Sequence, residues 1–168
     1  GIGLAACRGS DEPPTATMTP AVTQNPTSTA TEAPSTPTPS VEDEVLDAYA
    51  RYWDVYGEAL FELDADALDT VMTGPRLERA LEELESLRAN GQAVESVLRL
   101  DPVVTSIEDE QATVIDEYEN GSYLIDPETK EPIGGRGAPV VIREAFTFVR
   151  VEGVWKVLNS VRQAGPES

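Results

Sequence analysis

The chain has 168 residues, of which 31 are acidic, 12 are basic and none is histidine, giving a formal net charge of −19. A surface this negative repels the phosphates of nucleic acids, so we expect no nucleic-acid partner. The missing histidines remove the commonest general base and the commonest transition-metal ligand, and we expect neither a metal nor another cofactor.

A short N-terminal motif, Leu4-Ala5-Ala6-Cys7, resembles the lipobox of bacterial lipoproteins. In that family the cysteine receives a diacylglycerol group, and small residues before it fit the cleft of the signal peptidase. Residues 1–7 are therefore interpreted as the end of a signal peptide whose earlier part lies upstream. The resemblance implies a protein outside the cytoplasm, held to the cell membrane, or to the outer membrane of a diderm, by a lipid on Cys7. The alternative is a chance match within a run of small residues.

Residues 8–40 are rich in Thr, Pro, Ser and Ala and hold almost no large apolar side chain. Such a composition buries too little apolar surface to offset the entropy of ordering. We expect a disordered tether that, fully extended, reaches on the order of 100 Å.

Residues 41–164 hold both tryptophans, all five tyrosines and all three phenylalanines, and are the predicted folded domain. Ser40 is a suitable N-cap for a first helix, with Asp43 at its third position. An apolar stripe follows at helical spacing: Val45, Tyr49, Tyr52, Trp53, Tyr56, Leu60 and Leu63. A short second helix is predicted over 66–72.

A third predicted helix starts near Pro75 and stops at Asn90-Gly91. Its expected buried face is formed by Leu77, Leu81, Leu84 and Leu87 or Arg88.

After Gly91 the pattern favours strands, rich in β-branched and aromatic residues. The predicted strands are 94–100, 103–107, 112–118, 140–151 and 154–161, with a long loop over 126–137 and a bend or bulge at Pro102. The predicted fold class is α+β, with three N-terminal helices packed on a curved, mainly antiparallel four- to five-stranded sheet. Residues 165–168 are a tail.

Three stretches resemble the nuclear-transport-factor-2-like (NTF2-like) cone fold, and within it most closely the IMS domain. They are 68–77, at the link between the second and third helices, 87–91 at the third helix end, and 146–157, the final hairpin with Val154-Trp155-Lys156-Val157. The IMS domain occurs in plastid and cyanobacterial division proteins and in exported bacterial proteins. The resemblance covers about residues 44–163.

The cone fold often encloses a pocket between its first helix and the sheet. Aromatic side chains could line it and suit an apolar or sugar-like ligand. The candidates are Tyr49, Tyr52, Trp53, Tyr56, Tyr118, Phe146, Phe148 and Trp155. The simpler interpretation, which we favour, is that they are core residues.

Enzymes of this superfamily use acid–base side chains in that pocket, and Asp116, Glu144 and Tyr118 fall on predicted strands. Because their neighbours are charged, we expect a solvated strand face. The run 64–69 faintly resembles a calcium loop but lacks its glycine and its final glutamate, so helix capping is preferred. Glu82, Glu83 and Glu85 are expected on a solvent face.

The sequence therefore favours a membrane-tethered, non-enzymatic module that binds a small apolar ligand or a protein. One alternative is a pocket enzyme, isomerase- or dehydratase-like, that uses a buried carboxylate. Another is an accessory subunit of a cell-envelope complex, which binds a partner protein through an exposed apolar patch.

Overall fold

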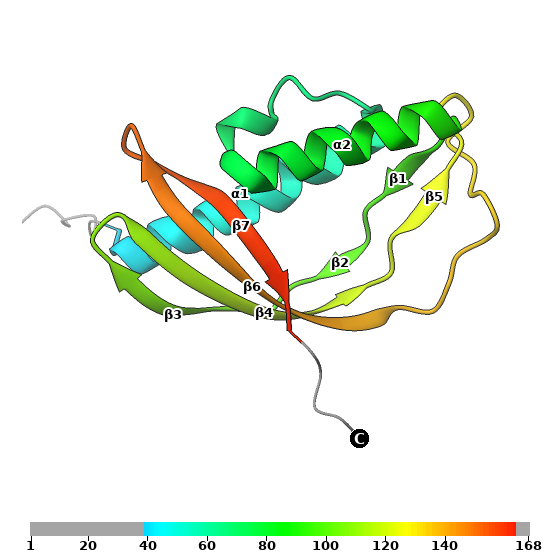
Figure 1. The fold of residues 1–168 in the computed structure, drawn as a ribbon. Helices are drawn as coiled ribbons and strands as arrows, with labels where there is room; N and C mark the ends of the chain where they lie inside the picture. Colours follow the sequence, from blue (N-terminus) through cyan, green and yellow to red (C-terminus); the bar gives the residue numbers. More distant parts are fainter. Residues whose placement is uncertain (1–38, 164–168) are drawn as a thin grey trace, which may run out of the picture. The chain divides into compact units, whose positions relative to one another are not determined.

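A computed structural model describes residues 39–163 of the chain. The predictions for Cys7, for the tether before residue 39 and for the residues after 163 lie outside the described residues. Two α-helices lie on one face of a curved antiparallel sheet, which confirms an α+β architecture (Figure 1). None of the described helices is long and apolar enough to cross a membrane.

Helix α1 (Val41–Glu62) begins at the predicted cap. The Asp43 backbone N–H donates to the Ser40 hydroxyl at 3.1 Å, and the Ser40 backbone N–H donates to the Asp43 carboxylate at 3.0 Å. The hydrogen bonds from Ser40, its side chain first, hold the pKa of Asp43 below its usual value. This capping box satisfies helix donors that would otherwise lack partners.

The predicted stripe of α1 is largely confirmed. One face of the helix is buried through Val45, Tyr49, Tyr52, Tyr56, Ala59 and Leu60. Trp53 and Leu63, also predicted for the stripe, are only half-buried.

The second predicted helix is wrong in extent, because only a single 3-10 turn, η1 (Leu68–Thr70), forms where 66–72 was expected. The residues after it pair with the last strand, β7 (Val154–Arg162). The Thr73 N–H donates to the Val157 carbonyl at 2.9 Å, and the Val157 N–H donates to the Val71 carbonyl at 2.9 Å. This pairing holds 71–73 against the sheet, so the domain has two α-helices instead of three.

Helix α2 (Gly74–Asn90) has Pro75 in its first turn and ends at Gly91, whose φ of 64° is left-handed, as predicted. Its buried face differs from the expected one.

The buried side chains of α2 are Arg76, Ala80, Leu84 and Leu87, while Leu81 is 43% exposed. Helix α2 packs against β7. Its buried face begins at Arg76, one residue before the predicted Leu77. The rotation brings an arginine into the interior where a leucine was predicted.

The main sheet has the order β2-β4-β6-β7, and every pair is antiparallel. Strand β3 also pairs with β4, along the same edge as β2. Its strands are β2 (Leu98–Arg99), β3 (Pro102–Glu108), β4 (Gln111–Asn120), β6 (Val140–Val151) and β7. A second, two-stranded sheet pairs β1 (Ala93–Glu95) with β5 (Tyr123–Ile125). The described residues form seven strands in two sheets, so the predicted single sheet of four to five strands is not exactly matched. The small sheet was not predicted.

The predicted strand 94–100 is broken into β1 and β2. Between them the Val97 N–H donates to the Ser122 hydroxyl at 3.1 Å, and the Gly121 N–H donates to the Val97 carbonyl at 2.8 Å. These bonds replace a regular ladder at the break. Pro102 simply begins β3, and the bulge lies between Val104 and Ser106.

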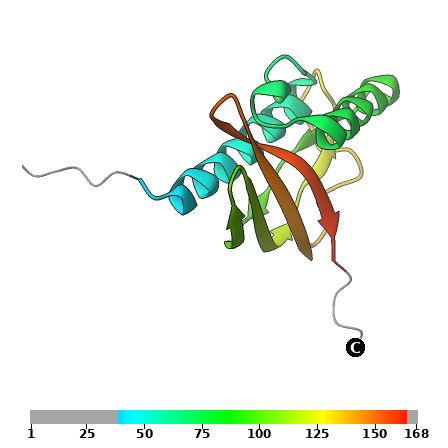
Figure 2. The ribbon, with the colours of Figure 1, turned by 60° about the vertical axis from the view of Figure 1, so that its left-hand side comes forward.

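The core lies where α1 crosses the concave face of the sheet (Figure 2). Alternate residues of β4 and β6 point towards the helix, and Phe146 and Phe148 are fully buried. The Tyr49 ring meets the Phe146 ring nearly edge-on, with centroids 5.1 Å apart. Such aromatic contacts add to the stabilisation from burial alone.

Asp116 on β4 is fully buried in this core, which corrects the expectation of a solvated strand face. The Tyr49 hydroxyl donates to its carboxylate at 2.5 Å, and the Asp101 backbone N–H donates to it at 2.9 Å. Burial, and then the bond to Asp116, raise the pKa of Tyr49 well above its usual range. The carboxylate therefore ties α1 to the sheet.

The Tyr49–Asp116 bond gives the first prediction. Tyr49→Phe removes one donor from a buried carboxylate, and we expect the free energy of unfolding to fall by about 1.5–3 kcal/mol. Urea denaturation measures the change. Tyr123→Phe, at a hydroxyl without a hydrogen bond to the described residues, is the matched control and should cost far less. Equal effects of the two substitutions would show that the bond to Asp116 contributes little.

Candidate functional site

A cavity of about 320 Å³ opens between α1, α2 and the concave face of the sheet, and we call it the inner pocket. Helix α1 contributes an aromatic wall and α2 contributes charged side chains, while β4, β6 and β7 supply the floor. Its aromatic and charged lining residues are Tyr52, Trp53, Tyr56, Tyr118, Arg76, Arg79, Glu83, Glu144 and Arg162.

The aromatic wall follows from helical spacing on α1. Tyr52 and Tyr56 lie one turn apart, and their rings stack with centroids 5.7 Å apart at 20°. Trp53 of α1 contacts Tyr118 of β4, and their ring centroids lie 5.4 Å apart. A flat or apolar ligand can pack on such faces.

Arg76, in the first turn of α2, is only 8% exposed. Its Nε donates to the Tyr52 hydroxyl at 2.7 Å, and its guanidinium carbon lies 4.4 Å from the centroid of the Tyr56 ring. Burial works to lower the pKa of Arg76, but the interactions with Tyr52 and Tyr56 outweigh it and raise the pKa. The residue is therefore a permanent cation in the wall of the pocket.

Two carboxylates face the same cavity, each bonded to a tyrosine. The Tyr118 hydroxyl donates to Glu144 on β6 at 2.8 Å, and the Tyr56 hydroxyl donates to Glu83 on α2. Burial first, and then Glu144, raise the pKa of Tyr118 above its usual range. The register places Glu144 between Asp116 and Arg162 on one face of the sheet.

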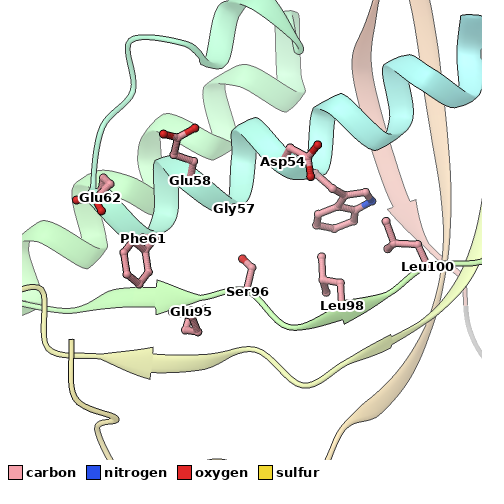
Figure 3. A pocket seen from close by; sticks show the side chains of 10 residues that line it. Asp54, Gly57, Glu58, Phe61, Glu62, Glu95, Ser96, Leu98 and Leu100 are labelled. Atoms are coloured by element: carbon pink, nitrogen blue, oxygen red, sulfur yellow. The ribbon is translucent and has the colours of Figure 1, made fainter.

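A second hollow, the acidic groove, runs along the other side of α1 against β1 and β2 (Figure 3). It measures about 560 Å³, and its charged residues are Asp54, Glu58, Glu62 and Glu95. Figure 3 shows Phe61 pointing from α1 towards the strands. Within residues 39–163, no three acidic side chains are grouped closely enough to hold a metal ion.

Gly57 allows α1 to approach the break between β1 and β2. A Cβ atom at this position would lie 3.3 Å from the Ser96 hydroxyl oxygen. Ser96, Trp53 and Leu98 line both the acidic groove and the inner pocket, so the two hollows adjoin beside this close approach.

The comparisons with known proteins yield similar structures and nothing at the level of sequence. No family model and no curated protein matches the chain. The intermembrane space region of the chloroplast protein ARC6 superimposes with a TM-score of 0.62 at 16% identity, covering 77% of this chain and 100% of that one.

Two further structures align at lower scores. An NTF2-like protein from Cytophaga hutchinsonii has a TM-score of 0.50 at 15% identity, covering 75% of this chain and 99% of its own. An NTF2-like family member from Streptomyces avermitilis, provisionally named a dehydratase, has a TM-score of 0.50 at 14% identity, covering 71% and 95%. The domain has the NTF2-like fold. The fold resemblance found in the sequence is thereby confirmed, including the similarity to an IMS region.

The predicted lining residues separate into three places within this NTF2-like domain. Trp53, Tyr56 and Tyr118 line the inner pocket, together with Tyr52. Tyr49, Phe146 and Phe148 lie in the packed core and line none of these hollows, and the same core cluster also includes Tyr52, Tyr56, Tyr118 and Trp155. Trp155 lines a different hollow of about 340 Å³ beside Arg150.

The acid–base candidates separate as well. Glu144 and Tyr118 reach the inner pocket, whereas Asp116 does not line it. Tyr118 is buried, so the expected solvated strand face is wrong for this residue too. Sequence reasoning missed the arginines of the pocket. The spacing of Arg76, Arg79 and Glu83, which puts all three on one face of α2, could have indicated them. The leucines of the same helix led to the prediction of a different buried face.

The helix capping expected for 64–69 does not form, because the N-cap of η1 is Ala67, which makes no side-chain cap hydrogen bond. The Asp64 carboxylate instead accepts the Asp66 backbone N–H at 3.0 Å in a local turn. The expectation for the acidic run of α2 is confirmed. Glu82, Glu83 and Glu85 are exposed, although Glu83 also stands at the rim of the inner pocket.

The buried tyrosines give a prediction of pH dependence. Burial is the main cause that raises the pKa of Tyr49, Tyr52, Tyr56 and Tyr118 above 10.0, with Tyr52 at about 12. Above pH 10.0 the unfolded chain binds fewer protons than the folded one, so stability is complete below this pH and falls as the pH rises.

We expect alkaline unfolding in which the phenolate absorbance of these tyrosines grows together with the loss of circular dichroism. Phenolate formation well before the loss of structure would contradict the assignment. The matching Tyr49→Phe variant should show a shallower fall of stability with pH, because one of the raised groups is gone.

Proposed function

We propose that this chain is an exported lipoprotein whose NTF2-like domain binds a small ligand in the inner pocket without transforming it. The observation that carries the proposal is the inner pocket itself. Elsewhere the concave face is filled by residues such as Tyr49, Phe146 and Phe148, yet beside Tyr52 and Tyr56 it leaves about 320 Å³ lined by aromatic and charged groups. An aromatic cavity with a few convergent polar groups is the usual form of a small-molecule site.

Binding is preferred to catalysis because of where the carboxylates lie. Asp116 is occupied by Tyr49 and by a backbone N–H beneath the helix, away from the cavity. The chain has no histidine to serve as a base. The Tyr118–Glu144 pair is the specific feature that favours the second candidate, an isomerase- or dehydratase-like reaction, because a carboxylate and a phenol meet at the cavity wall.

The location outside the cytoplasm rests on the sequence. The motif before Cys7 and the Thr- and Pro-rich residues that follow it are typical of a lipid anchor with a spacer. The similarity to an intermembrane space region supports a domain of this shape working beside a membrane. The same anchor would also suit an accessory subunit of a cell-envelope complex.

The anchor is tested by Cys7→Ser. We expect the natural chain to incorporate a labelled fatty acid and to fractionate with membranes, because the lipid supplies the attachment. The Cys7→Ser variant should lose the label and appear in the soluble fraction. If it stayed with membranes through salt and carbonate washes, lipid anchoring through Cys7 would be wrong.

The pocket is tested by Ser160→Leu. Ser160 on β7 is buried and faces the cavity, so a leucine should occupy part of its volume. Val161→Leu is the matched control, because Val161 is 57% exposed and belongs to the opposite face of the same strand. A small-molecule library screened by ligand-observed NMR should give compounds that bind the control and the unchanged domain but not Ser160→Leu.

Compounds that bind all three proteins equally would place the site elsewhere. Turnover of a bound compound, lost in Glu144→Gln, would instead favour the pocket enzyme.

A further inference from the structure

Arg76 is buried without a counter-ion. It is 8% exposed, and no carboxylate of residues 39–163 lies within 4.0 Å of its guanidinium. The ion pairs that do form involve Lys130, Arg143 and Arg150, all outside the inner pocket. Burial of an unpaired charge is costly, and in a chain with a net charge of −19 a carboxylate partner would have been easy to supply.

The guanidinium of Arg76 is held in a fixed orientation. Its Nε donates to the Tyr52 hydroxyl, and its guanidinium carbon lies 4.4 Å from the Tyr56 centroid and 5.5 Å from the Tyr52 centroid. The guanidinium also interacts with the Tyr56 hydroxyl. Its two terminal nitrogens carry four N–H donors. Donors therefore remain even where Tyr56 accepts one of them, and the residue lines the cavity.

Its neighbour Arg79 is different. One turn along α2, Arg79 is exposed and its terminal nitrogen donates to the Asn159 side chain at 2.6 Å and to the Ser160 carbonyl at 3.3 Å. A protein acceptor thus satisfies Arg79, whereas Arg76 has donors left for a ligand.

We propose that Arg76 binds the carboxylate of a small organic monoacid whose flat or apolar body packs on Trp53 and the tyrosines of the inner pocket. This inference rests on the proposed function, since it names the ligand class of the same pocket. The planar fork of an arginine matches the two oxygens of a carboxylate, and prior orientation by Tyr52 and Tyr56 reduces the entropy lost on binding.

The charges around the cavity select a single negative charge. The pocket is lined by three arginines, Arg76, Arg79 and Arg162, and by two carboxylates, Glu83 and Glu144, which leaves one net positive charge. The two carboxylates and the acidic domain repel a compact dianion such as phosphate more strongly than a monocarboxylate. The ligand's charge therefore has to be confined to one end, next to Arg76, with an uncharged body beyond it.

The test uses acids and their neutral amides as paired probes on the 168-residue chain carrying Cys7→Ser. The pairs are benzoate with benzamide, phenylacetate with phenylacetamide, and hexanoate with hexanamide, and inorganic phosphate is added as a compact anion. Binding is followed by NMR titration of the Trp53 indole signal. We expect the best-bound acid to exceed its amide by at least about tenfold, the smallest effect of a charge-assisted hydrogen bond, and phosphate not to compete.

Arg76→Met should make acid and amide bind alike while leaving the thermal midpoint of unfolding unchanged or higher, because a buried charge is removed. Arg76→Lys, which keeps the charge but loses the fork, should retain part of the preference. Arg99→Met is the matched control, since Arg99 is exposed on β2 outside the pocket, and it should preserve the full preference.

The possible failures are distinguishable. If acid and amide bind the unchanged domain equally, or phosphate binds better than any acid, the carboxylate inference is wrong and the binding pocket stands. If no probe of either kind binds, the proposed function fails as well. If Arg76→Met lowers the unfolding midpoint and weakens acid and amide to the same degree, Arg76 is a structural support for the tyrosines and the inference is overturned.

Discussion

The packing of α1 across the concave face of β4 and β6 is the contact on which the rest of the domain depends. Tyr49 makes this contact twice, with its ring against Phe146 and its hydroxyl on the buried carboxylate of Asp116. An apolar contact can slide along a sheet, whereas a hydrogen bond to a buried charge fixes one position. Because Tyr52 and Tyr56 follow on the same helical face, this single anchor also sets where the wall of the inner pocket stands.

One helix thus serves two environments. Around Val45 and Tyr49 it covers only the core, whereas Tyr52, Tyr56 and Leu60 are core residues that also line the inner pocket. The change coincides with the irregular link between β1 and β2, where the edge of the sheet departs from a regular ladder. The packed part of the core stabilises the domain. The part beside the inner pocket can therefore leave apolar surface uncovered and hydrogen-bond donors free for a ligand.

The sequence predicted those features that depend on local chemistry. The cap at Ser40 and Asp43, the stop at Gly91 and most of the strands of the main sheet follow from short patterns. Three features did not, and each depends on a distant partner. Residues 71–73 extend because they pair with β7, Asp116 is buried because Tyr49 reaches it from 67 residues away, and Arg76 turns inward because α2 packs through Ala80. A pattern of leucines cannot reveal which face of a helix a strand will meet.

The stability of the domain does not explain why residue 76 is charged. The stacked rings of Tyr52 and Tyr56 need no cation to pack, and a methionine would fill similar space without the cost of desolvating a guanidinium. Replacing a buried charge by an apolar side chain of similar volume is often neutral or stabilising. The domain is strongly acidic, yet no carboxylate of residues 39–163 forms an ion pair with this cation, which lines the cavity. A negative group that enters the pocket from outside accounts for this arrangement, since only then does the buried charge gain a partner.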